Sequence, residues 1–371
     1  MKLLHLSDSH LGKKVNDISM LTNQEYVLNQ ALELVSKENI QTVLIAGDIF
    51  DKPVANIEAI RLFNSFLKSL NAQNKEVLII SGNHDNIDRL TYLSDLVSPN
   101  IVFAKNFENE VQKVELSEDT DIYLLPYLTT AQVKKYNSND KKSSYQEGFK
   151  QIIDDIELDK NKVNILVAHQ FVVNSNAEAI LSDSEEKSVG TIDSINCEIF
   201  KDFGYVALGH LHCAQKVADN AYYSGSILKY SLSEINQKKK FNVIEIIDKK
   251  ISTKFFDIQF LNDIKEYKGY FEEFIDPEFY KKINTNDFIH FVLYDENLLD
   301  AKKELSRIYP NIIMLEFDNS FTKNLSQNFN FKLNKNKNIE EHFEDFYKMQ
   351  IDKDLTKSEK EIVKDVLNAT R

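Results

Sequence analysis

Residues 42–51 read Thr42-Val43-Leu44-Ile45-Ala46-Gly47-Asp48-Ile49-Phe50-Asp51. The stretch opens as a short apolar run, which is typical of a buried β-strand, and it ends in two aspartates behind a glycine. The glycine allows a tight backbone turn without a Cβ clash, so the side chain of Asp48 can point into a crowded site. The stretch therefore predicts a strand of an α/β sheet with a polar site at its carboxyl end.

Four more fragments repeat this arrangement, and most of them directly follow an apolar, strand-like run. They are Asp8-Ser9-His10, Gly82-Asn83-His84-Asp85, Ala168-His169 and Gly209-His210-Leu211-His212. Five of the eight histidines in the chain lie in these fragments. Glycine also precedes Asn83 and His210, where we expect the same tight turns. Because strand ends meet at one edge of an open α/β sheet, we expect the fragments to converge on one site.

The side chains of these fragments suit a pair of divalent transition-metal ions. Carboxylate, imidazole and amide oxygen together favour Mn²⁺, Fe²⁺ or Zn²⁺ over Ca²⁺, which prefers oxygen ligands alone. Two ions about 3.5–4 Å apart can bind both the attacking and the leaving oxygens of a phosphoryl displacement. One carboxylate must then lie between the ions. We expect it to be Asp48, which occupies the middle of the pattern on a central strand.

The pattern D-x-H, G-D-x-x-D, G-N-H-D, H, G-H-x-H resembles that of the calcineurin-like metallophosphoesterases, and the sequence matches it throughout. More narrowly, residues 3–12, 46–51, 205–212 and 223–231 are similar to the SbcD family of bacterial nuclease subunits. The resemblance implies an α/β fold in which a two-sheet β-sandwich is flanked by helices. A small α/β capping domain and a C-terminal helical tail would complete it.

The resemblance also implies a role for each site residue. Two divalent ions, expected to be Mn²⁺, would be held by Asp8, His10, Asp48 and His212 on one side and by Asp48, Asn83, His169 and His210 on the other. His84 would face the scissile phosphate, stabilising charge or protonating the leaving oxygen, while a hydroxide between the ions attacks. We infer that Asp51 orients His84 by accepting its second ring N–H. Asp85 either caps the helix after its loop or supports the site from behind.

Composition limits how the chain can bind nucleic acid. Its 371 residues suffice for two to three domains, and 45 basic against 58 acidic residues give a net charge of −13. That sign argues against a protein that holds DNA by bulk electrostatics, so we expect weak DNA affinity from this chain alone. Lysine runs at 13–14, 134–135, 141–142 and 238–240 either line a groove or are solvated surface. Two cysteines and the lack of a long apolar run indicate a soluble, cytoplasmic protein.

The pattern of the chain predicts four parts. Residues 1–258 would form the nuclease domain, 259–320 the capping domain, 321–337 an Asn- and Lys-rich linker and 338–371 the tail. The polar stretch from Asn174 to Ser188 is either a substrate-gating loop or an idle surface loop.

The tail carries an apolar stripe, which includes Ile339, Phe343, Phe346 and Tyr347, and then a capping box at Thr356-Lys357-Ser358-Glu359. The stripe either docks on a partner helix or folds back onto the body of the protein. We favour docking because the linker separates the stripe from the core.

Together with the resemblance, these features predict a DNA phosphodiesterase that works with an SbcC-type ATPase, since this chain has no G-x-x-x-x-G-K-[ST] phosphate loop. It would act as an exonuclease on duplex ends and as an endonuclease on single strands and hairpins, in repair, recombination and replication. We expect a homodimer within a heterotetramer and no membrane association.

Two alternatives remain open. A small-molecule or phosphoprotein phosphatase would share the metal core, but it would not need the extra domain or the tail stripe. A non-catalytic scaffold that tethers DNA ends would have no use for an imidazole such as His84 aimed at an open face.

Overall fold

The computed structural model describes residues 1–92, 94, 98–136, 144–174, 179–185, 194–296, 298, 300–318, 341–344, 347–348 and 353–369. The chain divides into two compact units. The first comprises residues 1–266, 284–290 and 309–314, and the second comprises 267–283, 291–308 and 315–371. The predicted linker at 321–337 lies outside the described residues, as do Ile339 and Phe346 of the tail stripe and the lysine pair at 141–142.

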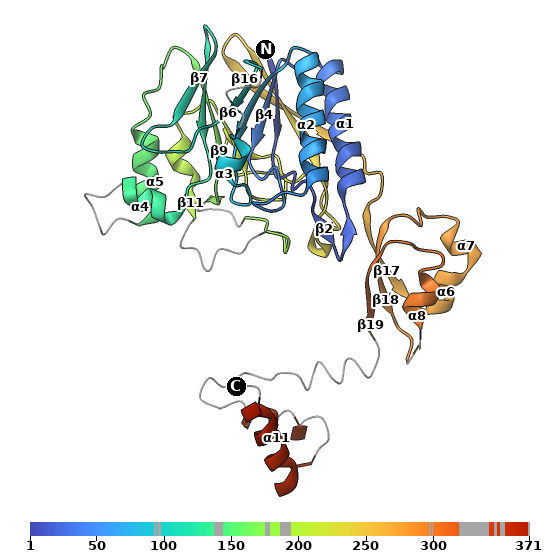
Figure 1. Cartoon of the computed structure of the whole chain (residues 1–371). Helices are drawn as coiled ribbons and strands as arrows, with labels where there is room; N and C mark the ends of the chain where they lie inside the picture. Colours follow the sequence, from blue (N-terminus) through green and yellow to red (C-terminus); the bar gives the residue numbers. More distant parts are fainter. Residues whose placement is uncertain are drawn as a thin grey trace. The chain divides into compact units, whose positions relative to one another are not determined.

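The first unit is built on two six-stranded sheets (Figure 1). The first sheet has the order β16-β15-β1-β4-β5-β6. Its strands are β1 (Lys2–Leu6), β4 (Thr42–Ala46), β5 (Glu76–Ile80), β6 (Ile101–Phe103), β15 (Lys240–Ile247) and β16 (Lys250–Asp257). Strands β1, β4, β5 and β6 run parallel, and β15 and β16 continue the sheet antiparallel beyond β1.

The second sheet has the order β13-β14-β12-β9-β8-β7. Its strands are β7 (Gln112–Ser117), β8 (Thr120–Leu125), β9 (Val163–His169), β12 (Tyr205–Gly209), β13 (Gln215–Lys216) and β14 (Ala221–Tyr223). The four central strands run parallel, and β7 and β13 pair antiparallel at the two edges.

The two sheets enclose a layer of apolar side chains. Leu44 and Ala46 of β4 share this layer with Val167 of β9, and all three are buried. Because side chains alternate along a strand, Val43 faces the other way and packs into the cluster that contains the first helices. Leu166 likewise packs into the cluster on the outer side of the second sheet. The predicted two-sheet sandwich is therefore confirmed.

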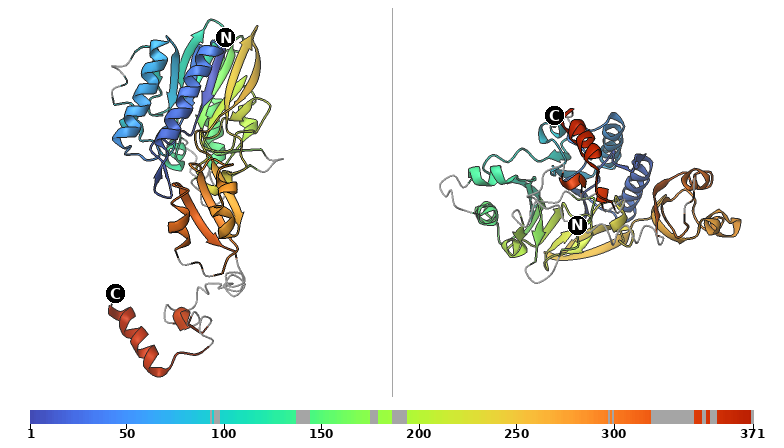
Figure 2. Two further views of the ribbon diagram at one scale, coloured as in Figure 1. Left: turned by 90° about the vertical axis from the view of Figure 1, so that its right-hand side faces the viewer. Right: turned by 90° about the horizontal axis from the view of Figure 1, so that it is seen from below.

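Helices cover the outer faces of both sheets (Figure 2). The first sheet carries α1 (Leu21–Lys37) and α2 (Ile57–Ala72), and the second carries α4 (Thr130–Tyr136) and α5 (Tyr145–Asp154). Asn56 caps the start of α2, and its side chain accepts the N–H of Ala59 at 2.7 Å. Ser144 caps the start of α5 and forms a capping box with Glu147.

Several short elements complete the first unit. They are β2 (Lys14–Val15), β3 (Ile18–Ser19), α3 (Ile87–Leu90), β10 (Val172–Val173), β11 (Ile195–Asn196) and the 3₁₀ helices η3 (Cys197–Phe200) and η4 (Leu232–Glu234). Strand β2 pairs with β3, and β10 pairs with β11.

A three-stranded sheet with the order β17-β18-β19 follows in the chain, as expected for a small α/β module. Its strands are β17 (Ile264–Gly269), β18 (Phe288–Leu293) and β19 (Ile312–Phe317), and the helices between them are α6 (Phe271–Ile275), α7 (Pro277–Tyr280) and α8 (Ala301–Leu305). Aromatic rings fill its interior: Phe274 lies 4.8 Å from Phe291, centroid to centroid, and Tyr267 lies 5.4 Å from Phe279.

The tail contains α11 (Lys357–Ala369), and the predicted capping box opens it. The backbone N–H of Thr356 donates to the Glu359 carboxylate at 2.7 Å, and the N–H of Glu359 donates back to the threonine hydroxyl at 3.4 Å. Among the helices described, none is both long and apolar enough to cross a membrane.

Candidate metal centre

The predicted ligands lie where strands of both sheets end on the same side of the sandwich. The loops after β1 and β4 are tied together, because the N–H of Asp8 donates to the carbonyl of Gly47 and the N–H of His10 to that of Asp48, both at 3.0 Å. The second sheet joins them through His169 at the end of β9, whose Nδ1 donates to the carbonyl of Ala46 at 2.8 Å. The structure thus brings all seven predicted ligands together.

Four of these ligands have left-handed backbone conformations. The φ angles are 50° at Asp8, 42° at His10, 50° at Asp48 and 109° at His210. Residues other than glycine rarely adopt positive φ, and such strain is held in place only where surrounding contacts demand it. Here the backbone turns sharply at each strand end, and the turn directs the next polar side chain into the site.

The glycines before the ligands serve two different purposes. Gly47 has a φ of 84°, as the predicted tight turn requires. Gly82 and Gly209 are not in that region. A Cβ on Gly82 would overlap the carboxylate of Asp48, and one on Gly209 would overlap the carbonyl of Ala46. At those two positions glycine is needed because another part of the site approaches closely and leaves no space for a Cβ atom.

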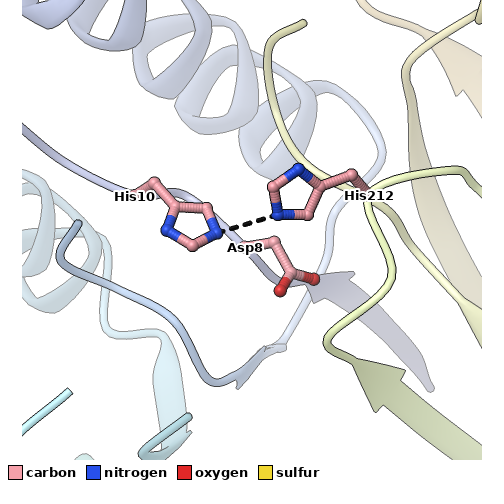
Figure 3. A group of neighbouring side chains, drawn as sticks. All are labelled: Asp8, His10 and His212. Atoms are coloured by element: carbon pink, nitrogen blue, oxygen red, sulfur yellow. Dashed lines mark hydrogen bonds between the residues drawn. The ribbon is translucent and has the colours of Figure 1, made fainter. Parts of the chain in front are cut away.

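One side of the site consists of Asp8, His10 and His212 (Figure 3). The two rings point toward each other, with Nε2 of His10 3.0 Å from Nε2 of His212, and all three side chains are buried. The carboxylate of Asp8 accepts the backbone N–H of His210 at 3.0 Å. Nδ1 of His10 has no hydrogen-bond partner among the described residues. Converging nitrogen and carboxylate donors of this kind suit a transition-metal cation.

The other side consists of Asn83, His169 and His210. The amide oxygen of Asn83 lies 3.0 Å from Nε2 of His169 and 3.0 Å from Nδ1 of His210. Since Nδ1 of His169 donates to a carbonyl, its Nε2 carries the lone pair in a neutral ring, so that two electron-rich atoms face each other. A proton or a metal cation between these two atoms would satisfy both. The residues therefore fit a second ion.

The carboxylate of Asp48 lies between the two sides. Its Oδ2 is 3.6 Å from Nε2 of His10 and 3.5 Å from Nε2 of His169, and its Oδ1 accepts the backbone N–H of His84 at 2.9 Å. Burial alone would raise the pKa of Asp48, but the charge of His169 and its hydrogen bond hold that pKa far below its usual range. Asp48 is thus an anion that faces both groups of donors.

The imidazoles of the site divide into neutral and protonated rings. Burial lowers the pKa of His210 to about 3 and lowers the pKa of His10 and of His212, so these rings are in the neutral form that binds metals. Burial would also lower the pKa of His169, but the charge of Asp48 raises it to about 9. Burial, helped by the charge of Asp48, raises the pKa of Asp8 to about 8.

His84 is oriented by Asp51 through the backbone. Its Nδ1 donates to the backbone carbonyl of Asp51 at 2.8 Å, whereas the Asp51 carboxylate accepts from the ammonium of Lys13 at 2.8 Å. The ring of His84 stands edge to face against that of His10, with centroids 4.7 Å apart. The predicted residue therefore contacts His84, but the side chain of Asp51 has a different partner.

Asp85 supports the site and does not cap a helix. Its carboxylate accepts the N–H groups of Ile49 at 3.1 Å, Phe50 at 3.0 Å and Gly82 at 3.0 Å, so it joins the loops after β4 and β5. The cap of α3 is Asn86, whose side chain accepts the N–H of Arg89. Of the two readings of Asp85, the capping one was wrong.

A polar network that was not predicted from the sequence lies behind His212. It consists of Ser184, Glu185, Glu234 and Lys239, and Lys239 is only 2% exposed. Lys239 belongs to the lysine run at 238–240, so both readings of that run, as a groove lining or as solvated surface, were wrong at this position. The only sequence signal was Ser231-Leu232-Ser233-Glu234, which reads as an ordinary capping pattern.

Known proteins are similar to this chain along much of its length. The family model for the calcineurin-like phosphoesterases matches residues 1–214. The SbcD component of the nuclease SbcCD from Staphylococcus epidermidis is 33% identical over 380 residues, which cover 99% of this chain and 98% of that protein. A dimetal phosphatase from Danio rerio is 12% identical with a TM-score of 0.43, over 70% of this chain and 96% of the other. GAP50, the anchor in the inner membrane complex of Plasmodium, is 12% identical with a TM-score of 0.40, over 71% and 90%.

Replacing Asp85 by alanine should weaken both the fold and the metal centre. The variant leaves three backbone N–H groups without their acceptor, so the free energy of unfolding should fall by about 2–4 kcal/mol. Mn²⁺ affinity should fall about 10- to 100-fold. Urea unfolding in EDTA and calorimetric Mn²⁺ titration measure the two effects. Asp88→Ala, at an exposed position three residues later, is the control and should change stability by less than about 0.5 kcal/mol.

Mn²⁺ binding should tighten as the pH rises from 6 to 8. With pKa values of about 8 and about 9, Asp8 and His169 hold protons at neutral pH that an incoming cation must displace. Lowering the pH keeps these protons in place and opposes binding, whereas raising it removes them. Titration calorimetry in buffers of different ionisation enthalpy should detect proton release at pH 7. Affinity that is constant over this range would contradict the assignment.

Proposed function

Because the chain belongs to the calcineurin-like phosphoesterase family, we propose that it is a metal-dependent DNA nuclease and the partner of an SbcC-type ATPase. The observation that carries the proposal is the position of Asp48, whose carboxylate faces nitrogen donors from both groups of predicted ligands. A single-ion site would not need a shared carboxylate. The sequence similarity to a nuclease component along the whole chain supports DNA as the substrate.

In this proposal two divalent ions, expected to be Mn²⁺, occupy the centre. Asp8, His10, Asp48 and His212 would hold one ion, and Asp48, Asn83, His169 and His210 would hold the other. When bound, such ions supply a nucleophile at neutral pH and positive charge for the phosphate. The chain itself supplies buried imidazoles and carboxylates in fixed positions, so the site needs little reorganisation during the reaction.

His84 is the residue we assign to the departing oxygen. Its Nδ1 donates to the carbonyl of Asp51, and this contact fixes the orientation of the ring. The ring is partly exposed, unlike those of His10 and His169, so it can reach a phosphodiester that enters from solvent. There it would stabilise charge or donate a proton.

The substrates we propose are duplex ends, cut exonucleolytically, and hairpins or single strands, cut endonucleolytically. The net charge of −13 is unfavourable for DNA binding by this chain alone, so an ATPase partner would supply much of the affinity. The helical tail is the proposed docking segment for that partner, with the exposed Ile362 on α11 as one of its apolar contacts. The cytoplasm is the proposed compartment.

A homodimer is proposed through α2 and the segment that follows β5. Ile57, Ile60 and Tyr92 are 61%, 48% and 81% exposed, and a hollow of about 730 Å³ lined by Phe63 and Leu67 lies among such side chains. Exposed apolar patches of this kind mark protein interfaces.

Replacing His84 by alanine should lower cleavage of an end-labelled hairpin duplex by about 10²- to 10⁴-fold in Mn²⁺, while Mn²⁺ still binds. Asp51→Ala retains the backbone carbonyl that holds His84, so its loss should stay below about 10-fold. A phosphomonoester serves as the second substrate. Intact DNA with rapid phosphomonoester hydrolysis would support a phosphatase, and DNA binding without cleavage, even with the ATPase and ATP present, would support a scaffold.

Replacing Ile60 by glutamate should convert the dimer into a monomer, because the variant buries a charge in the proposed apolar contact. Sedimentation velocity measures the state of association. Ile247→Glu, at a similarly exposed isoleucine on β15, is the matched control and should remain a dimer. Equal behaviour of the two variants would place the interface elsewhere.

A further inference from the structure

The network behind His212 contains a buried ion pair that has no part in the predicted ligand set. The ammonium of Lys239 lies 2.6 Å from the carboxylate of Glu234, and both residues are buried. Lys239 also donates to the carbonyl of His212 at 2.7 Å and to the side-chain oxygen of Gln237 at 2.9 Å. The hydroxyl of Ser226 is a fourth oxygen, at 2.9 Å. Oxygen atoms thus surround the ammonium, and each of its three hydrogens has an acceptor.

The carboxylate of Glu234 in turn accepts hydrogen bonds from several donors. Its Oε1 accepts the backbone N–H of Tyr230 at 3.3 Å and the hydroxyls of Ser231, at 3.0 Å, and Ser184. Its Oε2 accepts from Lys239. A carboxylate that lies 2.6 Å from an ammonium and also accepts a backbone N–H is ionised, because both partners stabilise its negative charge.

The hydroxyl of Ser184 therefore has a fixed direction. It carries one hydrogen, which it donates to Glu234. Its second contact, with Nδ1 of His212 at 2.7 Å, must then be one in which the ring nitrogen donates. A neutral imidazole protonated at Nδ1 has its lone pair at Nε2. That nitrogen faces His10 and Asp8 in the proposed metal centre (Figure 3).

We propose that Ser184, held by the Glu234–Lys239 ion pair, is a positioning residue that selects the metal-binding tautomer of His212. The inference rests on the proposed function, because it concerns the affinity of one of its two ion sites. Burying an ion pair is expensive unless further hydrogen bonds satisfy it. Two of those bonds lead to His212: Lys239 donates to its carbonyl, and Ser184 links Glu234 to its imidazole. Partners of this kind behind a ligating histidine raise metal affinity by fixing ring orientation and tautomer.

Further hydrogen bonds hold residues 182–185, the stretch around Ser184, against the site. Glu185 accepts the backbone N–H of His212 at 2.6 Å, and the N–H of Asp183 donates to the hydroxyl of Ser233 at 2.9 Å. The side chain of Gln237 donates to Ser182 at 3.0 Å. Residues 182–185 are therefore fastened to the segment that carries the metal ligand and its ion pair. This favours a working part of the site over an idle surface loop for these four residues.

The decisive variants are Ser184→Ala, Ser184→Thr and Ser233→Ala. Ser184→Ala removes only the hydroxyl between His212 and Glu234, and Ser184→Thr restores a hydroxyl. Ser233→Ala loosens the same stretch without touching His212, so it is the control for a general effect on packing. Far-UV circular dichroism of the full chain verifies that each variant folds.

Calorimetric titration with Mn²⁺ is the first measurement, and histidine ¹⁵N NMR of the metal-free full chain is the second. Ser184→Ala should weaken one of two Mn²⁺ sites about 10- to 100-fold and leave the other unchanged. Ser184→Thr and Ser233→Ala should bind as the wild type does. In the NMR spectra, His212 should be protonated at Nδ1 in the wild type and should lose that preference in Ser184→Ala.

The outcomes separate the inference from the function on which it rests. Two wild-type Mn²⁺ sites that are unaffected by Ser184→Ala would overturn the role of Ser184 and leave the nuclease proposal standing. Equal losses in Ser184→Ala and Ser233→Ala would also overturn it, because packing alone would then explain the effect. A wild-type chain that binds no Mn²⁺ would overturn the proposed function and the inference together.

Discussion

The site depends on one buried anion, the carboxylate of Asp48. Its two oxygens face Nε2 of His10, Nε2 of His169 and the backbone N–H of His84, which come from three different segments of the chain. A buried carboxylate is stable only when opposite charge or hydrogen-bond donors surround it. The ends of β1, β4, β5 and β9 must therefore lie within a few ångströms of one another. The left-handed backbone at Asp8, His10 and Asp48 follows from this requirement, because the loops after β1 and β4 must turn into the site directly after each strand ends.

Contacts around this anion hold the left-handed backbone at Asp8, His10 and Asp48 in place. Asp85 ties the loops after β4 and β5 together through three backbone N–H groups, and His169 ties the second sheet to β4 through the carbonyl of Ala46. The ion pair between Glu234 and Lys239 lies behind His212. The ligands are thus held by rigid strands and by partners that are themselves satisfied. Such preorganisation is what a centre for phosphoester chemistry requires.

The sequence was sufficient for features that repeat with a short period or use a distinctive residue type. Apolar runs such as Thr42–Ala46 identified the parallel strands, and strand-end histidines and aspartates identified residues that meet in one site. It was insufficient where a contact joins distant residues or uses the backbone. Residue type cannot predict that the carbonyl, not the carboxylate, of Asp51 contacts His84, nor that Lys239 is buried in a lysine run. The contact of Ser184 with Glu234 spans 50 residues and has no local signal.

The most direct test of this account is a crystal structure of the full chain soaked in Mn²⁺, with anomalous scattering used to locate the ions. Two anomalous peaks should appear about 3.5–4 Å apart, both coordinated by the carboxylate of Asp48, with His212 at one and Asn83 at the other. A single peak, or two peaks of which only one contacts Asp48, would contradict the shared carboxylate on which the two-ion site is built.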